Sequence, residues 1–334
     1  MLSRVQNCRS CVWRGGVEVA RDFPLEELDH WLADEANLVW LDLHEPDGAR
    51  LSELAQELDL DPLAVEDAVE PRERPKATRH ATHTFLTCYS TTLTGTDAEL
   101  ADLELGRVSA FILRNALITV RQDDLVDMDA ILSRWTEDGL LDHGVAALVH
   151  GMLDELVDGH FDTIERMDEM LEGLEDLLFD PTIRTRTVQQ RIFAIRKALV
   201  QLRRVVLPMR EVVTSVMRFR AEGGNALSAE LDGNFNDLYD HVIRAAEWTE
   251  SLRDMVSSIF ETNLSLQDAR LNEIMKKLAA WAAIIAVPTA VTGWFGQNVP
   301  YPGFNELAGV IASIAAILLG SVGLYITFRK FDWL

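Results

Sequence analysis

The sequence predicts a mixed α/β cytoplasmic domain with long helices, which continues into an α-helical membrane domain of two spans. Three observations predict this fold. Residues 278–328 contain a single charged side chain, Glu306. Apolar and β-branched runs of strand length occur before about residue 143, and helix-forming residues dominate after it. In that later part, proline and glycine stand mainly at the ends of periodic stretches, as expected between helices.

The membrane domain is predicted from two apolar runs, Leu278–Phe295 and Leu307–Phe328, separated by the turn-rich stretch Asn298–Asn305. Each run is long enough to cross a hydrocarbon core of about 30 Å as a helix. The alternative, a buried hairpin in a soluble protein, would need a core that encloses both helices on all sides. We expect a first transmembrane helix over 278–298, an extracytoplasmic loop over 299–306 and a second transmembrane helix over 307–328.

Basic residues lie just outside both spans, and the connecting loop has none. The positive-inside rule then places both termini in the cytoplasm and the chain in the cell membrane, as a multi-pass protein of the inner or plasma membrane. The N-terminus has no apolar stretch of signal-peptide type, in agreement with a cytoplasmic start. The flanking basic residues are Arg270, Lys276 and Lys277 before the first span, and Arg329 and Lys330 in the basic tail 329–334.

The part before the membrane divides into three regions. Residues 1–142 form the N-terminal α/β domain, with a helical pattern over 49–69 and strand patterns over 38–43, 82–93, 108–113 and 116–121, the last two joined by a turn at Arg114-Asn115. Residues 143–227 form an antiparallel pair of long helices, 144–179 and 182–222, ended by Asp180-Pro181 and Gly223-Gly224. Residues 228–277 form a stalk helix that runs on into the first span.

The stalk carries two heptad repeats. An apolar heptad repeat means that the helix packs against neighbours along its length. An acidic repeat of the same period is most simply a solvated face. The apolar set is Leu238, Ala245, Leu252, Ile259 and Leu266, and the acidic set is Asp240, Glu247, Asp254, Glu261 and Asp268.

The acidic line leads into the membrane helix. Steps of three and four residues from Asp268 reach Asn272, Met275, Ala279, Ala282, Ala286 and Thr289. Two helices cannot enclose a water-filled path, so a transport function would require several copies around an axis. In that arrangement Asp254, Glu261 and Asp268 would ring an acidic vestibule, and the small and polar residues would line the bore. The alternative is that alanine and threonine only allow helices to approach closely.

Composition narrows the function classes. The chain has 54 acidic and 31 basic residues and a net charge of −23, which disfavours binding to nucleic acid and suits cations, although acidity also serves solubility. We find no Gly-rich phosphate loop or catalytic motif, so neither an enzyme nor an ATP-driven pump is predicted. His80 and His83 lack a third ligand at metal spacing, and we expect them to be surface residues on or near a strand.

Residues Glu261 to Asn298 resemble the membrane-entry signature of the CorA family of magnesium transporters. Members of that family end their first span with Tyr-Gly-Met-Asn, where this chain has Phe295-Gly296-Gln297-Asn298. Further segments resemble the family in the same order along the chain. They are Arg74-Pro75-Lys76, LVDGHFDTIERMDEMLEGLE, LVQLRRVVLPMREVV and FNDLYDHVIRAAEWTESLRDMV.

The resemblance implies a funnel-shaped homopentamer with membrane lipid around it and Mg²⁺ as the transported and regulatory ion. Gly296, Gln297 and Asn298 would form the selectivity filter, where amide oxygens bind the water shell that Mg²⁺ gives up reluctantly. Met275 and Leu278 match the hydrophobic gate of the family, which closes by dewetting. The further pore-lining positions are Asn272, which matches a polar ring, and Ala282 and Thr289.

The resemblance also implies a regulatory metal site between subunits. Asp237 matches one of its carboxylates, whereas the family's second carboxylate comes from the strand region near Thr94, where this chain has threonine. Asp97 lies close to that position but is not aligned with it. Occupancy by Mg²⁺ would neutralise facing carboxylates and hold a closed state.

Three functions remain open at this point. The first is a channel for Mg²⁺ influx down the electrochemical gradient, with Co²⁺ and Ni²⁺ as further substrates. The second is a Zn²⁺ carrier like ZntB, coupled to protons, because Gln297 replaces the usual methionine and that branch also varies this position. The third is a membrane-anchored cation sensor that does not conduct.

Overall fold

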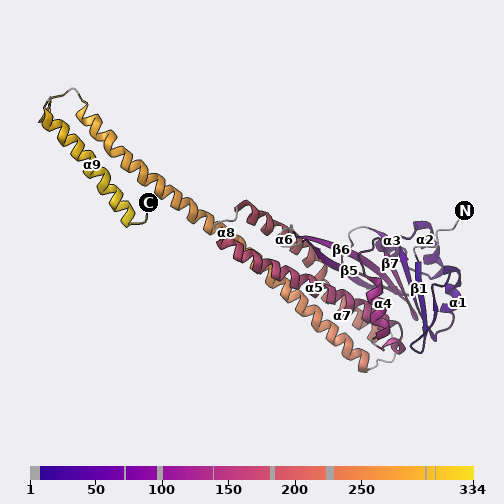
Figure 1. Cartoon of the computed structure of the whole chain (residues 1–334). Helices are drawn as coiled ribbons and strands as arrows, with labels where there is room; N and C mark the ends of the chain where they lie inside the picture. The colour runs from indigo at the N-terminus through magenta and orange to yellow at the C-terminus, as the bar shows by residue number, and fades with distance from the viewer. Residues whose placement is uncertain are drawn as a thin grey trace. The chain divides into compact units, whose positions relative to one another are not determined.

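The computed structural model describes residues 8–70, 73–95, 101–137, 139–180, 185–222, 229–297, 299–304 and 306–334. The chain forms two compact units, Met1–Ser257 and Ser258–Leu334. The first unit contains a β-sheet with helices on both faces, and the second contains two apolar helices (Figure 1).

The first unit is built on a seven-stranded sheet with the order β2-β1-β3-β7-β6-β5-β4. All neighbouring strands are antiparallel except β3 and β7, which pair in parallel. The strands are β1 (Cys8–Arg14), β2 (Val17–Arg21), β3 (Asn37–His44), β4 (Lys76–Arg79), β5 (Thr84–Thr94), β6 (Asp102–Ile112) and β7 (Ala116–Arg121).

The central strands follow from their continuous apolar runs. Strands β3 and β7 are buried along nearly their whole length, because helices cover both faces of the sheet there. The strands at the two edges, β2 and β4, are short and largely exposed, and β4 carries Lys76 and Arg79. Short, charged edge strands discourage pairing with other chains.

Alternation along the strands sorts the core into two layers. Val39 and Leu41 of β3 face α2 (Gly48–Glu57) and α3 (Pro62–Val69), with α1 (Leu28–Leu32) at the edge of the same layer. Trp40, between them, faces the opposite layer, which includes Trp135 of α4 (Met128–Glu137). The sheet is therefore sandwiched between short helices on one face and the long helices on the other (Figure 1).

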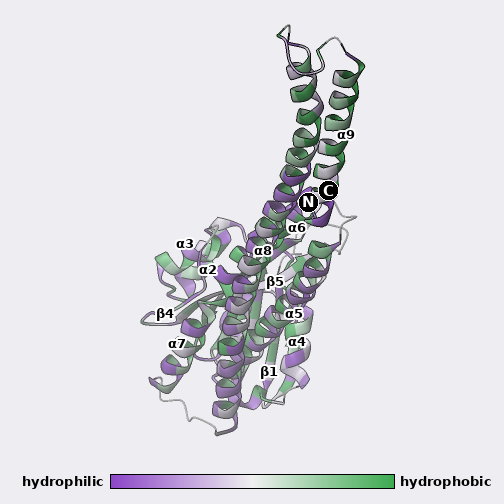
Figure 2. Ribbon diagram, turned by 90° about the vertical axis from the view of Figure 1, so that its left-hand side faces the viewer, coloured by the Kyte–Doolittle hydropathy of each residue, from purple (hydrophilic) through white to green (hydrophobic). Residues whose placement is uncertain are grey.

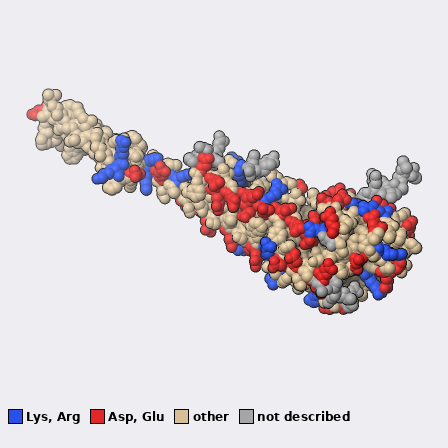
Figure 3. Space-filling view, turned by 60° about the horizontal axis from the view of Figure 1, so that its bottom comes forward, with Lys and Arg blue, Asp and Glu red and all other residues tan. Residues whose placement is uncertain are grey.

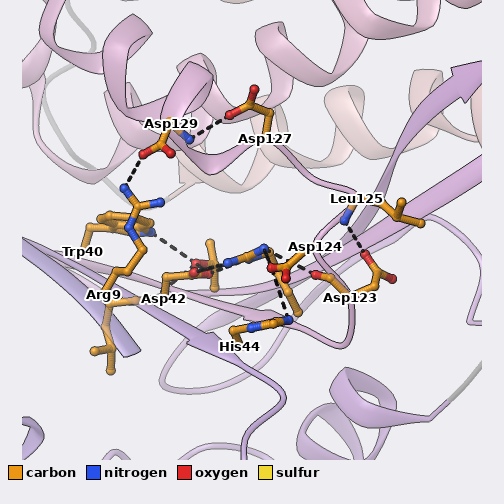
Figure 4. Close-up of polar contacts among 12 residues, drawn as sticks. Arg9, Trp40, Asp42, His44, Asp123, Asp124, Leu125, Asp127 and Asp129 are labelled. Atoms are coloured by element: carbon orange, nitrogen blue, oxygen red, sulfur yellow. Dashed lines mark hydrogen bonds and ion pairs between the residues drawn. The ribbon is translucent and has the colours of Figure 1, made fainter. Parts of the chain in front are cut away.

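A buried ion pair joins the parallel strands. Arg121 Nη2 of β7 lies 2.7 Å from Asp42 Oδ2 of β3, and the two side chains are 6% and 1% exposed. The Thr119 hydroxyl donates to Asp42 Oδ1 at 2.7 Å, and Trp40 Nε1 donates to the Thr119 hydroxyl oxygen at 3.2 Å (Figure 4). Buried charges are tolerated when they are paired and hydrogen-bonded in this way.

The helical region contains α5 (Val145–Phe179), α6 (Thr185–Val206) and α7 (Met209–Glu222). The single helix predicted over 182–222 is therefore wrong in one respect, since the structure divides it at Leu207-Pro208. Proline lacks the backbone N–H of a helix interior, and its ring clashes with the preceding turn. Glu211 N instead donates to the Pro208 carbonyl as α7 begins.

Helix α8 (Ala229–Phe295) runs for 67 residues and confirms the predicted continuity between stalk and first span. The apolar heptad positions Leu238, Ala245, Leu252 and Ile259 are each 2% exposed or less, and Leu266 is half-buried. All five acidic heptad positions are exposed. The two repeats thus separate a packed side of α8 from a solvated one.

The second unit pairs the end of α8 with α9 (Leu307–Lys330). The most apolar 18-residue windows of the two helices have mean hydropathies of 1.6 and 2.3, and only 6% of each window is buried within the chain (Figure 2). A core hairpin of a soluble protein would be mostly buried, so this alternative does not fit. The helices approach closely at Gly320, where an added Cβ would lie 2.7 Å from Val287 Cγ1.

Candidate functional site

The part of α8 in the second unit presents the predicted pore-lining residues on one side. At about 100° per residue, the seven positions fall within an arc of about 120°. Met275 and Leu278 are 61% and 62% exposed, so two large apolar side chains of this face are largely unpacked among the residues that the structure describes. The residues of this face, which are all exposed, are Glu261, Asp268, Asn272, Met275, Leu278, Ala282 and Thr289.

Two threonine hydroxyls bind backbone carbonyls of α8 near Pro288, and one of them, Thr289, is the polar residue in the membrane part of this face. Proline cannot donate to the preceding turn, so the helix there lacks one hydrogen bond. The hydroxyl of Thr289 donates to the Ile285 carbonyl at 3.0 Å, and the hydroxyl of Thr292 donates to the Pro288 carbonyl at 2.8 Å. Each threonine oxygen keeps lone pairs that can accept from water.

Helix α8 ends at the predicted filter sequence. Gly296 N donates to the Thr292 carbonyl at 2.8 Å, and Gln297 N donates to the Trp294 carbonyl at 3.3 Å. A Cβ at Gly296 would lie only 2.8 Å from the Thr292 carbonyl oxygen, so the tight end of this helix requires glycine. Gln297 is exposed, and Asn298 lies outside the described residues.

An aromatic cluster supports this end of the helix. The Tyr301 hydroxyl donates to the Phe295 carbonyl at 3.1 Å, and the two rings meet edge to face with centroids 5.1 Å apart. Phe304 continues the cluster, 5.3 Å from the Tyr301 ring. The sequence analysis predicted only a turn in this loop. Three aromatic residues close to Pro302-Gly303 could have indicated that their rings pack together.

The stalk region in the first unit extends the acidic character. Asp254 is exposed, and its only described partner is the neighbouring Arg253, at 2.7 Å. Because both side chains of this pair are largely exposed to solvent, Arg253 neutralises the negative charge of Asp254 only weakly. Acidic side chains cover much of the visible face of the first unit, whereas Glu306 is the single charge between residues 278 and 328 (Figure 3).

The predicted regulatory carboxylate, Asp237, is 71% exposed on α8, and its Oδ2 lies 3.8 Å from His241 Nε2. Asp97, its predicted counterpart, lies outside the described residues. Thr94, where the family's second carboxylate was expected, donates its hydroxyl to the Asp102 carbonyl across the β5–β6 pair. The described residues therefore place Asp237 at a free surface without bringing a second predicted ligand to it.

A second acidic group was missed by sequence reasoning. Ligand atoms of Asp154, Asp158 and His241 lie within 4.8 Å of one another, as in a metal site. Arg134 of α4 already pairs with this group, contacting Asp154, Glu155 at 2.8 Å and Asp158 at 2.5 Å. Partial burial raises the pKa of Asp154. Arg134 thus supplies the positive charge that a divalent cation would otherwise supply, and no local sequence pattern connects residue 134 with 154–158.

Comparison with known proteins agrees with this architecture. A sequence model of the family described as CorA-like Mg²⁺ transporter protein matches residues 35–330. The cobalt/magnesium transport protein CorA of Thermotoga maritima is 26% identical over 333 residues, covering 95% of this chain and 90% of the relative. The zinc transport protein ZntB of Pectobacterium carotovorum is 26% identical over 271 residues, covering 78% and 77%.

The fold is likewise that of a solved transporter. The complete structure of the CorA magnesium transporter from Methanocaldococcus jannaschii matches with a TM-score of 0.75 at 20% identity, covering 100% of both chains. An α/β domain, long helices and two apolar C-terminal helices are common to the match and to the sequence prediction. The chain therefore belongs to the family of CorA-like Mg²⁺ transporter proteins and is a divalent-cation transporter of the membrane, not an enzyme.

Proposed function

We propose that this protein is the subunit of a homopentameric channel that admits Mg²⁺ into the cell down its electrochemical gradient. The observation that carries the proposal is the exposed face of α8 from Glu261 to Thr289, which ends at Gly296 and Gln297. A single chain leaves Met275 and Leu278 exposed on that face. Packing of several copies around an axis would give these residues partners and would enclose a path.

The residues of this face divide the transport task. Asn298 would contact the water shell of the arriving ion, because Mg²⁺ dehydrates reluctantly and amide oxygens can bind its waters. Met275 and Leu278 would form an apolar ring that closes the path by dewetting. Asp254, Glu261 and Asp268 would draw the cation through the cytoplasmic mouth. Asn272, Ala282 and Thr289 complete the lining.

The orientation proposed for the membrane has both termini in the cytoplasm. The last turn of α9 carries Arg329 and Lys330, and Lys276 and Lys277 precede the first span on α8. No Lys or Arg stands in the loop between the spans. This distribution supports the orientation by the positive-inside rule. The inside-negative membrane potential would then drive cations inward.

Regulation by cytoplasmic Mg²⁺ is part of the proposal. Asp237 would bind Mg²⁺ with a carboxylate of an adjacent subunit, and Asp97 is the candidate on this chain. The exposure of Asp237 supports such a role, because its carboxylate is accessible to another copy. Removal of Mg²⁺ would leave like charges facing one another and favour the open state.

Zinc is the second candidate ion. It is favoured by the similarity to a zinc transport protein ZntB and by Gln297 in place of methionine. In that case the carrier would be coupled to protons and its influx would depend on pH. Co²⁺ is a further candidate, since the relative from Thermotoga maritima is a cobalt/magnesium transport protein. Ni²⁺ stays a candidate from the sequence resemblance alone.

Ion influx into proteoliposomes tests these proposals directly. The purified protein is reconstituted with a Mg²⁺ or Zn²⁺ indicator inside, and influx is compared between the intact chain and Asn298→Ala, with Asn236→Ala as an amide control in the cytoplasmic part of α8. Mg²⁺ influx that is lost only in Asn298→Ala supports the channel. Influx of Zn²⁺ alone with proton dependence assigns the zinc function instead. Well-assembled oligomers that pass neither ion would show a sensor that does not conduct.

A further inference from the structure

A cavity of about 440 Å³ lies in the first unit, and none of its lining residues belongs to the face of α8 assigned to conduction. Two chain turns form one side of it, residues 79–84 between β4 and β5 and residues 112–114 between β6 and β7. Residues of α5, α7 and α8 form the other side. The volume is within the range of small-molecule pockets, which are commonly lined by apolar side chains and a few polar groups.

The lining of this cavity is basic, although the chain has 54 acidic and 31 basic residues. Arg79, Arg114 and Arg220 line it together with His80 and His83. Among the described residues that line it there is no Asp or Glu. Each arginine is paired with a carboxylate that does not line the cavity: Arg79 with Glu222, Arg114 with Glu35 and Arg220 with Asp232. An anion would therefore bind by replacing a carboxylate in one of the more exposed pairs, which contribute little stability.

Two of the arginines are placed to bind such an anion. Arg79 Nη1 lies 2.9 Å from a carboxylate oxygen of Glu222, and the side chains are 41% and 55% exposed. Exposed pairs of this kind contribute little, so Arg79 can turn to a ligand at small cost. Arg220 is only 11% exposed, pairs with Asp232 and lies over the Phe235 ring at 5.1 Å. Its guanidinium is thus held in a fixed orientation, and guanidinium groups match the geometry of phosphate oxygens.

The rest of the wall is apolar. Val145 and Val149 of α5, Val216 of α7 and Phe235 of α8 line the cavity and are each 9% exposed or less. The cavity therefore joins a cationic part to an apolar part. An inorganic anion would use only the first, whereas an organic anion with a flat or apolar body would use both.

His83 lines the cavity and has a ring nitrogen that can accept a hydrogen bond from a ligand. Its side chain is 4% exposed, and Nδ1 lies 3.0 Å from the Thr82 hydroxyl oxygen. That hydroxyl donates its one hydrogen to the Asp59 carbonyl at 2.7 Å, so it can only accept from His83. Nδ1 therefore carries the ring hydrogen, and Nε2 presents a lone pair.

The Nε2 atom is buried and has no hydrogen-bond partner among the described residues. Burial, together with His80 stacked at 4.8 Å, lowers the pKa of His83, so the ring is neutral near pH 7. A buried acceptor without a partner is unfavourable. Because Nε2 is closed to solvent, the ring would turn toward the cavity to accept from an N–H or O–H group of a ligand. The prediction that His83 is a surface residue was wrong, and its burial is what makes it a candidate contact.

We propose that this cavity binds a nucleotide. The phosphate would contact Arg79 and Arg220, the base would lie against the apolar wall, and an exocyclic amine or ribose hydroxyl would donate to His83 Nε2. A fatty acid would satisfy the arginines and the apolar wall, but it has no donor for His83. The proposal is independent of which ion crosses the membrane.

Binding of AMP and ATP to the full-length protein in lipid nanodiscs tests the proposal by calorimetry, with inorganic phosphate and palmitate as comparison ligands. Measurements with EDTA and with excess Mg²⁺ separate nucleotide binding from chelation of the metal. We expect Arg79→Gln to weaken nucleotide binding at least about tenfold, since a charge-assisted contact is lost. Arg196→Gln removes the same charge from an exposed position on α6 and should leave binding unchanged.

Two further variants separate ligand contact from folding. Ala146→Phe places a ring in the cavity and should abolish binding, and His83→Phe should weaken nucleotides while leaving palmitate unaffected. Thermal unfolding identifies any variant that fails to fold. The proposal is overturned if neither nucleotide binds the intact chain, if phosphate or palmitate binds as tightly as AMP, or if Arg79→Gln and Arg196→Gln weaken binding equally.

Discussion

Gly296 is the residue on which the end of the first span depends. An added Cβ would lie 2.8 Å from the Thr292 carbonyl oxygen, a backbone atom that accepts the Gly296 N–H in the same turn. Because a backbone atom cannot move aside as a flexible side chain can, the clash would displace Gln297, the next residue of the proposed filter.

We therefore expect Gly296→Ala to reduce Mg²⁺ influx in proteoliposomes by about tenfold or more, since sub-ångström shifts at a coordination ring disturb how an ion's water shell is held. Gly293→Ala is the matched control. An added Cβ there meets nothing within 4 Å, and alanine is the better helix former. Equal influx for the two variants in oligomers of normal size would contradict this role for Gly296.

His160 makes the stability of the first unit depend on pH. It is 1% exposed, and its Nε2–H donates to the Tyr89 carbonyl at 2.8 Å. Burial lowers its pKa to about 4, below the value of about 6.5 in an unfolded chain. Between these values the unfolded state binds a proton that the folded state does not, so stability falls as the pH drops from 6.5 towards 4.

His160→Gln should remove this dependence, because glutamine can donate the same hydrogen bond and does not titrate. Relative to the intact chain, we expect the variant to regain on the order of 3 kcal/mol between pH 6.5 and 4, at about 1.4 kcal/mol per pH unit. Thermal unfolding at several pH values measures it, and His30→Gln, at an exposed histidine, provides the comparison. Parallel pH profiles for both variants and the intact chain would exclude the effect.

The helices and strands show which parts of the fold a sequence can predict. Central strands β3, β5, β6 and β7 were predicted because their apolar runs are long. Strands β1, β2 and β4 were missed. The edge strands β2 and β4 are short and carry charged residues. Strand β1 is an interior strand, but its apolar run, Cys11–Trp13, is only three residues long. In the candidate site, helical spacing predicted the stripe that includes Asn272, Met275, Ala282 and Thr289, whereas Leu278 was predicted from the family resemblance. The Arg134 group and the cavity proposed to bind a nucleotide were not predictable, because each is assembled from elements far apart in the sequence.

The two membrane helices touch where a small residue allows it. At Gly320 of α9, an added Cβ would lie 2.7 Å from Val287 Cγ1 of α8. Small residues at such contacts drive association of helices in lipid, where burial of apolar surface gives no advantage.

Gly320→Val should therefore separate α9 from α8 and lower the temperature at which the oligomer dissociates in detergent, by about 5 °C or more for a cost of about 1–3 kcal/mol. Gly323→Val introduces the same side chain one turn later, where nothing lies within 4 Å of the added Cβ. Size-exclusion chromatography after heating measures both. Identical dissociation temperatures for the two variants would show that the contact at Gly320 does not stabilise the oligomer.

The net charge of −23 is distributed unevenly over the whole molecule. Helix α6 contains six basic residues and no acidic one, and residues 278–328 contain only Glu306. The acidic line of α8 is exposed at every heptad position. If five copies surround an axis, Asp254, Glu261 and Asp268 bring 15 carboxylates to the cytoplasmic mouth, and their fields add where the surrounding protein excludes water.

Neutralising that line should slow transport in a manner that depends on salt. For Asp254→Asn combined with Glu261→Gln and Asp268→Asn, we expect Mg²⁺ influx to fall by about threefold or more at low ionic strength, and the difference to shrink as added salt shortens the Debye length from about 30 Å to about 8 Å. The control neutralises Glu26, Glu27 and Glu53, three exposed carboxylates on or near short helices of the first unit, and changes the net charge equally. A similar loss of influx in both triple variants would mean that total charge matters and position does not.

A loss of influx that persists unchanged at high salt would mean that the acidic residues of α8 bind the ion directly. A vestibule that concentrates cations at the end of the pore requires two results together. The loss of Mg²⁺ influx must be larger in the α8 triple variant than in the control variant, and it must shrink as salt is added.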